Sequence, residues 1–597
     1  MLGARRFTTP LVLILVLAAA WRLALAAQMP CISRDGVNYS WQARELGRRG
    51  AAALRVAEFD QHPLYALTIL GLQRGMVALG AADTPLTWQR AGQSVAWLAG
   101  MAVVVLSGLL ARRAVRRLNL PVDADRALLF GLALAALLPL NTWLSADVMS
   151  DQLHLALYLA AAAVLLHLRD WRAAAACGVL SGLAFLTRPE GAVVCAAAVV
   201  VLLGGLGCTA IDKRLTRCVA VLLAFLLIAA PYWLLSGRLT PKAAKETIDQ
   251  FRAGTVSDAH TVATAPGDVS SVPRGRRGRP ESLRPPPAVP AATALRSETL
   301  AVEAAPAHGV SGLSAFAALV RRDVAWFAAA PLALYETFRA GRVVIPLLAI
   351  PPLIVLRRQL RGPVLLGLVT CLASHFALTC LLLTRHGYLA PRHTLPVVAL
   401  LLPFAAIFLA HVIADTRRQG RAWVGWLLAI ASIAPLAAYS LRVPNYGDAY
   451  VARAARWLIE HDPDARNKLL LGGASQRRIA FYADMRWQPW PENTPDADAR
   501  YAELRRHIVE AAPDSRPDYL AIETGPGAEL AGNAELLQRL LADPALAGRA
   551  HAIHTETSAD VRPVTLHVAS FDWASGPSRR GAGRMRALPS ARRITCR

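Results

Sequence analysis

Carboxylates stand at several points where an apolar segment of the chain gives way to a polar one. Asp35 follows the first long apolar run, Asp147 and Asp151 lie between two later runs, and Glu190 follows Leu186-Thr187-Arg188-Pro189. A positioned carboxylate can take the proton from a hydroxyl group as its oxygen attacks an electrophilic carbon. These acids are therefore candidates for general-base catalysis at the edge of an apolar layer.

Cations recur at the same kind of junction. They are Arg188, Arg238, Lys242, Arg385, His386, Arg392 and His393. Arginine binds phosphate with two parallel hydrogen bonds, lysine binds it as a point charge, and both stabilise a phosphate leaving group. Each cation taken alone is also explained as a long side chain reaching from lipid to water. The two histidines have no cysteine partner nearby, so their spacing predicts no zinc site.

The elements that must position these side chains are membrane-spanning helices. The chain has 597 residues, of which 55% are hydrophobic and 18% charged, and its mean hydropathy is +0.36. A membrane-spanning helix needs about 20 apolar residues, and by that rule about eleven segments are candidates. They are approximately 10–28, 86–111, 126–145, 149–168, 173–188, 190–210, 217–236, 341–357, 362–384, 394–414 and 421–441.

Basic residues between these segments predict the orientation in the cell membrane. Arg5 and Arg6 precede the first segment, which favours a cytoplasmic N-terminus, and every second loop after that is basic. The apolar stretch 63–80 is interrupted by Gln73 and Arg74, so we expect a helix that lies at the interface. If that stretch spanned the membrane, all later loops would change side. The net charge of +24 is dispersed over these loops and the tail, which argues against nucleic acid as a partner.

The rest of the chain divides by composition. We expect a transmembrane catalytic half over 1–236 with its first outward loop at 29–85, an outward loop over 237–340, helices over 341–441, an extracytoplasmic α/β domain over 442–575 and a basic disordered tail over 576–597. Within the long loop, 252–310 is rich in Pro, Ala, Arg and Ser and predicts disorder, and 316–339 predicts an interfacial helix. The α/β domain shows strand patterns at 468–471, 519–522 and 564–569, and a helix at 475–482.

Several motifs together give the chain a family resemblance. They are the acid-bearing first loop, His62-Pro63-Leu64-Tyr65, Leu186-Thr187-Arg188-Pro189-Glu190-Gly191, Pro231-Tyr232-Trp233 and Tyr388-Leu389-Ala390-Pro391-Arg392-His393-Thr394-Leu395-Pro396. In this layout, over about 1–440, the chain resembles the GT-C membrane glycosyltransferases, in particular the protein O-mannosyltransferase and aminoarabinose-transferase-like group (glycosyltransferase families 39 and 83).

The resemblance implies a transferase that moves a sugar from a polyprenyl-phosphate donor to a lipid, glycan or protein acceptor, on the extracytoplasmic face. It implies that Asp35 is the catalytic base. The family's second outward acid matches Asp147 or Asp151, of which we prefer Asp151. Arg188, Glu190, Arg392, His62 and Tyr65 are then expected to bind substrate. No cofactor is firmly implied, and a divalent metal is compatible with the pattern.

Two other functions fit the composition. A transporter or lipid flippase would carry its ionisable residues near the middle of the membrane, whereas most acids here stand at the ends of apolar segments. A membrane scaffold with a soluble sensor domain would explain 442–575 but not the acids and cations at the junctions. The sequence therefore favours the enzyme and does not identify the sugar or the acceptor.

Overall fold

The computed structural model describes 2–56, 59–168, 170–204, 210–238, 326–355, 363–386, 389–442, 449–490, 497–526, 530, 532–558 and 563–573. Two compact units make up the chain. The first comprises 1–29, 38–83 and 87–444, and the second comprises 30–37, 84–86 and 445–597. The predicted disordered segment 252–310, Lys242 and the predicted tail lie outside the described residues.

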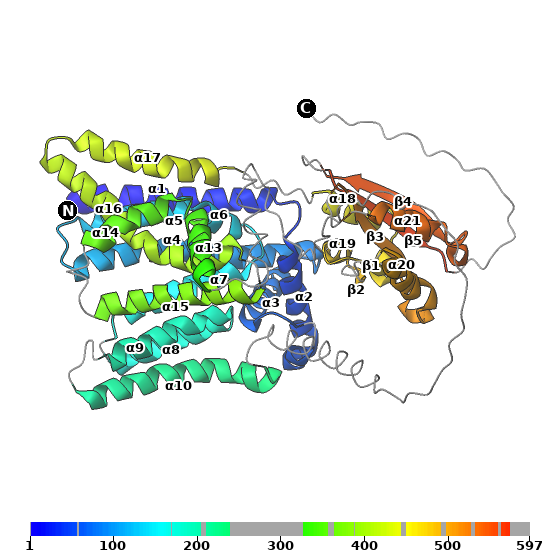
Figure 1. The fold of residues 1–597 in the computed structure, drawn as a ribbon, viewed down its shortest axis with the longest axis horizontal. Coiled ribbons are helices and arrows are strands. Elements are labelled where there is room, and N and C mark those ends of the chain that lie inside the picture. Colours follow the sequence, from blue (N-terminus) through cyan, green and yellow to red (C-terminus); the bar gives the residue numbers. More distant parts are fainter. Residues whose placement is uncertain are drawn as a thin grey trace, which may run out of the picture. The chain divides into compact units, whose positions relative to one another are not determined.

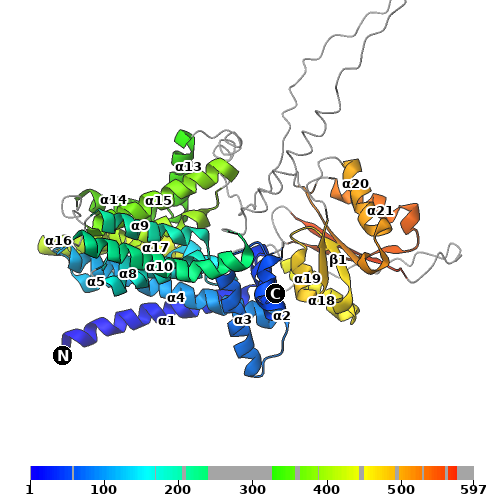
Figure 2. The ribbon, with the colours of Figure 1, turned by 90° about the horizontal axis from the view of Figure 1, so that it is seen from below.

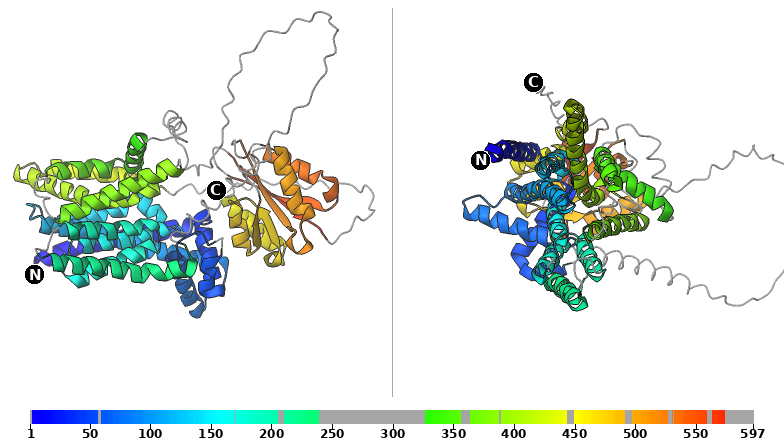
Figure 3. Two further views of the ribbon diagram at one scale, coloured as in Figure 1. Left: turned by 60° about the horizontal axis from the view of Figure 1, so that its bottom comes forward. Right: turned by 90° about the vertical axis from the view of Figure 1, so that its left-hand side faces the viewer.

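The first unit is a helical bundle (Figure 1). Seen end-on, its long helices stand side by side (Figure 3). Its α-helices and 3₁₀ turns (η) are α1 (Leu2–Gln28), α2 (Arg34–Arg49), η1 (Gly50–Arg55), α3 (Pro63–Ala78), α4 (Pro85–Arg117), α5 (Ala124–Leu137), α6 (Pro139–Leu144), α7 (Ser150–Leu165), α8 (Trp171–Phe185), η2 (Pro189–Gly191), α9 (Ala192–Leu203), α10 (Ile211–Ser236), α13 (Trp326–Ala340), α14 (Val344–Val355), α15 (Pro363–His386), η4 (Pro391–Thr394), α16 (Leu395–Arg418) and α17 (Ala422–Ser440).

A helix or a broken helix occupies each apolar segment predicted from the sequence. Among the described residues, six helices are long and apolar enough to cross a membrane, in α1, α4, α10, α15, α16 and α17, and the bent pair α13–α14 makes a seventh if it counts as one span. α7, α8 and the η2–α9 stretch are apolar but shorter. The chain is thus a polytopic membrane protein, and the number eleven stays a prediction.

One predicted span is broken in two, at Leu138–Pro139. Proline lacks the N–H group that would continue the helix, so α5 stops and leaves carbonyl groups without partners in an apolar surrounding. Asn141 donates to the carbonyl oxygen of Ala135 at 2.8 Å, and the fully buried Arg22 of α1 donates to the same oxygen at 3.4 Å. Arg22 also donates to Ser145 Oγ at 3.4 Å. A charged side chain inside the bundle is therefore held by the break in α5.

The predicted outward loop 29–85 is largely helical. Asp35 lies in the first turn of α2, where the sequence predicted a loop. The helix forms because the apolar residues Tyr39, Ala43 and Leu46 recur four and three positions apart and are buried. α3 covers the stretch that was expected to lie at the interface. Figure 1 shows α2 and α3 running across the direction of the long helices. The interfacial position of 63–80 stays a prediction.

The second unit contains an α/β sandwich. Its sheet has the order β2-β1-β3-β5-β4, in which β1 (Leu469–Gly472) runs parallel to β2 (Arg486–Pro489) and β3 (Tyr519–Thr524), and β5 (Thr565–Phe571) runs antiparallel to β3 and β4 (Ala550–Thr557). Side chains alternate along β1 and β3: Leu470 and Tyr519 pack on α18 (Ala449–His461) and α19 (Arg477–Ala483), and Leu471 and Leu520 face the other way. α20 (Ala497–Arg505) and α21 (Asn533–Leu541) cover that other face (Figure 2).

A short segment from the start of the chain belongs to the second unit. It comprises 30–37, and the backbone N–H of Ile32 donates to the hydroxyl group of Tyr482 in α19 at 2.8 Å. On the other face of the sheet, the buried carboxylate of Asp543 accepts hydrogen bonds from Tyr501 and Arg505 at 2.7 and 2.8 Å. Burial alone would raise the pKa of Asp543, but the hydrogen bonds outweigh burial and hold the pKa below its usual range.

Candidate functional site

Arg188 joins two of the predicted acids in one network. Its Nη1 lies 2.5 Å from Asp151 Oδ1, and its Nη2 and Nε lie 3.3 and 3.5 Å from the two carboxylate oxygens of Glu190. The side chains of Asp151 and Glu190 are only 4% and 8% exposed. A carboxylate buried this deeply needs a cation nearby, and a single guanidinium serves both acids.

The backbone around Arg188 is fixed by the end of α8. Proline at 189 disfavours a helical conformation for the residue before it, and Arg188 is extended, with φ −157° and ψ 144°. Gly191 then passes so close to α8 that a Cβ atom there would lie 2.2 Å from the Phe185 nitrogen. The sequence Arg-Pro-Glu-Gly thus makes a tight turn that directs Arg188 and Glu190 to the same side.

Asp151 is positioned by the start of α7. It lies in the first turn of that helix, where the helix dipole favours a negative charge. The adjacent Ser150 makes a 2.6 Å hydrogen bond with the hydroxyl group of Tyr39, which lies one turn after Asp35 in α2. Asp151 Oδ2 is buried and has no hydrogen-bond partner among the described residues. One oxygen of this acid is therefore held by Arg188, and the other is available to a ligand.

A narrow cavity of about 10 Å³ lies beside this network. Its walls bring together parts of α7, α15, η2, η4 and α16, and the polar residues that line it are Asp151, His154, Arg188, Glu190, His375, Arg392 and His393. Four predicted site residues, Asp151, Arg188, Glu190 and Arg392, thus meet at one point. A volume of this size accommodates about one water molecule, so a sugar phosphate enters only if the walls move apart.

The other predicted residues do not line this cavity. His62 is buried, with its ring 5.1 Å from Phe185 and 5.6 Å from Tyr232. Tyr65 is fully buried, and its hydroxyl group donates to the carbonyl oxygen of Gly92 at 3.1 Å. These contacts place His62 against α8 and α10 and Tyr65 against α4, and the role of both in substrate binding stays a prediction. Asp35 is in the first turn of α2, in the short part of that helix (34–37) that belongs to the second compact unit.

Two histidines of the cavity were not predicted from the sequence. His154 lies in α7 and contacts Thr187 at 3.4 Å, and His375 lies in α15 and contacts the carbonyl oxygen of His393 at 3.1 Å. Both are almost fully buried. The signal was present, because an ionisable residue inside an apolar helix is rare and is by default a candidate for function. Among the described residues, no group of three or more His, Cys, Asp or Glu side chains is arranged to hold a metal ion.

Comparison with known proteins gives a match in structure only. No family model and no curated protein sequence matches the chain. The crystal structure of ArnT from Cupriavidus metallidurans in the apo state matches with a TM-score of 0.53 and 14% identity, covering 94% of this chain and 98% of ArnT. ArnT bound to undecaprenyl phosphate matches with a TM-score of 0.48 and 14% identity, covering 95% and 99%.

The apo oligosaccharyltransferase of Archaeoglobus fulgidus matches with a TM-score of 0.47 and 12% identity, covering 86% of this chain and 69% of that protein. The apo ArnT match runs through both the helical bundle and the C-terminal α/β domain. The chain therefore has the fold of ArnT, a GT-C membrane fold, as its sequence predicted.

Proposed function

We propose that the protein is a membrane glycosyltransferase that transfers a sugar from a polyprenyl-phosphate donor to a hydroxyl group of an acceptor. The observation that carries the proposal is the convergence of Asp151, Arg188, Glu190 and Arg392 on one cavity. The fold of ArnT, shared over 94% of this chain, supports it. ArnT itself binds undecaprenyl phosphate, which is a donor carrier of the proposed class.

The reaction releases a proton from the acceptor hydroxyl group and adds negative charge to the leaving phosphate. The acceptor oxygen attacks the anomeric carbon and loses its proton, while the bond from that carbon to the phosphate oxygen breaks and the polyprenyl phosphate leaves with added negative charge. In our proposal Asp35 takes the proton and Arg392 stabilises the leaving phosphate. Asp151 orients a substrate hydroxyl group through its available Oδ2, while Arg188 holds the other oxygen.

This division of roles follows from how Asp151 is held and from the family resemblance. A carboxylate oxygen engaged by a guanidinium is a poor proton acceptor, and Asp151 has one such oxygen. In the GT-C resemblance the base is an acid of the first outward loop, which corresponds here to Asp35. We therefore propose Asp35 as the base and Asp151 as a positioning residue.

The test is turnover by the purified full-length protein in proteoliposomes. Release of polyprenyl phosphate from a polyprenyl-phosphate sugar would be followed by mass spectrometry, with a lipid and glycan extract as the acceptor source. Asp35→Asn should reduce turnover by about 10² or more while the donor still binds, which is the scale of general-base catalysis. Asp212→Asn is the matched control, because Asp212 is also in the first turn of a helix but is exposed. Turnover of Asp35→Asn within a few-fold of the parent, in folded protein, would move the role of base to Asp151.

The same measurement separates the enzyme from a lipid transporter. The buried ionisable residues Arg22, His154 and His375 favour a transporter when taken alone. A transporter would move the lipid between leaflets and leave the sugar–phosphate bond intact. Arg22, however, is fully accounted for by its contacts at the break in α5, so it needs no transported ligand.

A further inference from the structure

A second and larger cavity lies in the helical bundle, lined by different residues from the candidate site. It measures about 680 Å³ and lies between α13, the bend after it and α17. Its lining is mostly apolar, with Pro331, Leu334, Phe338, Val343 and Pro435, and it also contains Tyr335, Tyr439, Arg339 and Arg342. This volume is in the range of pockets that bind organic ligands.

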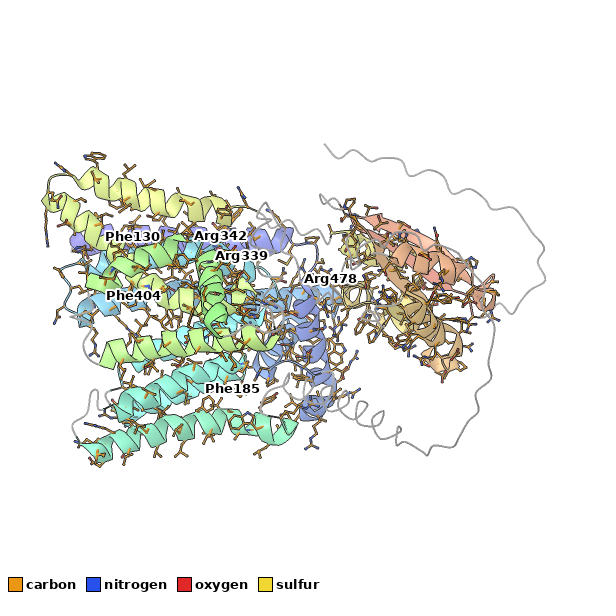
Figure 4. All side chains as sticks on the ribbon, viewed as in Figure 1. Phe130, Phe185, Arg339, Arg342, Phe404 and Arg478 are labelled. Carbon is orange, nitrogen blue, oxygen red and sulfur yellow. The ribbon has the colours of Figure 1, made fainter. Side chains whose placement is uncertain are left out.

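Cations are concentrated around one aromatic ring of this cavity. The guanidinium carbon of Arg342 lies 4.3 Å from the ring centre of Tyr439, and that of Arg442 lies 4.8 Å from the same centre. Arg342 also lies 5.7 Å from the ring of Trp143. Arg339 lies close to Arg342 (Figure 4) and pairs with Glu336 at 3.2 Å. Among the described residues, Glu336 is the only carboxylate paired with any of these three arginines, so an excess of positive charge remains.

The backbone that presents Arg342 is unusual. α13 and α14 meet at an angle of 110°, and α13 runs across the direction of the long helices (Figure 1). At the bend, Arg342 and Val343 have φ angles of 52° and 63°. This left-handed conformation is unfavourable for side chains with a Cβ atom, and most of all for a β-branched residue. Strain of this kind is typical of sites that hold a ligand or a defined shape.

The surroundings of the cavity are those of a lipid-facing surface. Leu334, Leu347 and Leu441 are 50–55% exposed, and α17 is itself a candidate membrane span. A small soluble anion would satisfy the arginines but leave the apolar walls uncovered. A ligand with a phosphate at one end and hydrocarbon at the other would satisfy both.

We propose that this cavity, formed by α13, the bend after it and α17, binds the phosphate head group of an anionic glycerophospholipid of the bilayer. Its ligands are Arg342 of the lining and Arg442, which stacks on the lining residue Tyr439. The phosphate lies between the two guanidiniums, which repel each other without it, and the acyl chains leave along the exposed leucines. Stacking on Tyr439 holds both guanidiniums in place before the lipid arrives.

The experiment is native mass spectrometry of the full-length protein with added phosphatidylglycerol, phosphatidylcholine and undecaprenyl phosphate, each alone. In the parent protein, phosphatidylglycerol should bind more tightly than phosphatidylcholine. The double variant Arg342→Gln/Arg442→Gln should lose about ten-fold in affinity for phosphatidylglycerol. The double variant Arg342→Lys/Arg442→Lys should keep part of it, because the charge remains but the two-point geometry is lost.

The control for charge is Arg418→Gln/Arg421→Gln, which removes two charges at exposed positions. Arg418 ends α16 and Arg421 directly precedes α17, at the end of α17 far from Tyr439. It should bind phosphatidylglycerol like the parent. Arg442→Gln alone, at an exposed position, keeps the test valid if the Arg342 variants fail to fold, and should by itself weaken binding several-fold.

Three results would overturn the proposal. They are unchanged phosphatidylglycerol binding in folded Gln variants, an equal loss in the Arg418/Arg421 control, and a loss confined to undecaprenyl phosphate. The last result would assign the cavity to the polyprenyl chain instead of a phospholipid. None of these readouts depends on sugar transfer, so the outcome is independent of the proposed enzymatic function.

Discussion

Replacing Arg188 with alanine tests whether the network around it holds the bundle together. The change leaves Asp151 and Glu190 without their shared cation, although their side chains are only 4% and 8% exposed. Breaking a buried ion pair by removing one partner costs about 3–5 kcal/mol, because a charge is left buried without compensation. We expect the free energy of unfolding to fall by about this amount. Protonation of one acid would limit the loss.

A variant that removes all three charges distinguishes two possible causes of the lost stability, uncompensated charge and lost packing. In Arg188→Met/Asp151→Asn/Glu190→Gln no charged group is left in the network, so most of the lost stability should return. Arg48→Ala is the matched control, because Arg48 pairs with Glu45 at 3.5 Å but is 74% exposed. An exposed ion pair contributes about 0.2–1 kcal/mol or less, so this variant should unfold almost like the parent.

The assay is reversible unfolding in mixed detergent micelles, followed by circular dichroism. Our reasoning would be refuted if Arg188→Ala unfolded like Arg48→Ala. It would be refuted equally if the triple variant were as unstable as Arg188→Ala, since the loss would then come from packing and not from charge.

Three further predictions can be checked with standard methods. Gly191→Ala should reduce the yield of folded protein, judged by size-exclusion chromatography, because its Cβ would lie 2.2 Å from backbone atoms of α8, whereas Gly75→Ala, with nothing within 4 Å, should fold normally. The depressed pKa of Asp543 means that its carboxylate stabilises the domain above a pH of about 4, the usual Asp pKa, and that this contribution disappears as the pH falls through the lower folded value. Asp543→Asn should therefore destabilise the domain at neutral pH and flatten this acid dependence, measured by hydrogen exchange. Reporter fusions after Arg116 and Arg500 should report the cytoplasm and the opposite side respectively, and an outward report at Arg116 would mean that 63–80 spans the membrane.

The helices could be predicted from the sequence because lipid imposes a simple rule. A segment that crosses the bilayer must satisfy its backbone internally and cover itself with apolar side chains, so hydropathy alone locates it. The break in α5 at Pro139 was also readable, since proline ends a helix, but hydropathy treated 126–145 as one segment. Hydropathy does not identify the partner of each polar side chain, such as the carbonyl oxygen of Ala135 that accepts a hydrogen bond from Arg22.

The strands of the C-terminal domain were predicted only in part, because local sequence does not show which segments pair. The three strands that the sequence predicted, β1, β3 and β5, are the inner strands of the sheet, where both faces are covered and the residues are apolar. The two that were missed, β2 and β4, are the edges. Edge strands face solvent and carry polar residues, as in Arg486-Trp487-Gln488-Pro489, so their apolar pattern is weak. Their existence follows from pairing with a neighbour, which local sequence does not encode.

The site shows why the number of phosphate-binding residues is overestimated when every cation near a membrane surface is counted as one. From the sequence, Arg188 was a candidate to bind the donor phosphate because it stands at the end of an apolar segment. In the structure its guanidinium is used by Asp151, 37 positions away, and by Glu190, so its charge is already balanced. The trio carries one net negative charge, and a donor phosphate would be repelled by it unless another cation intervenes. Arg392, which lines the same cavity, supplies that cation in our proposal. Donor binding should accordingly respond more to Arg392→Ala than to loss of the Arg188 charge in the neutral triple variant.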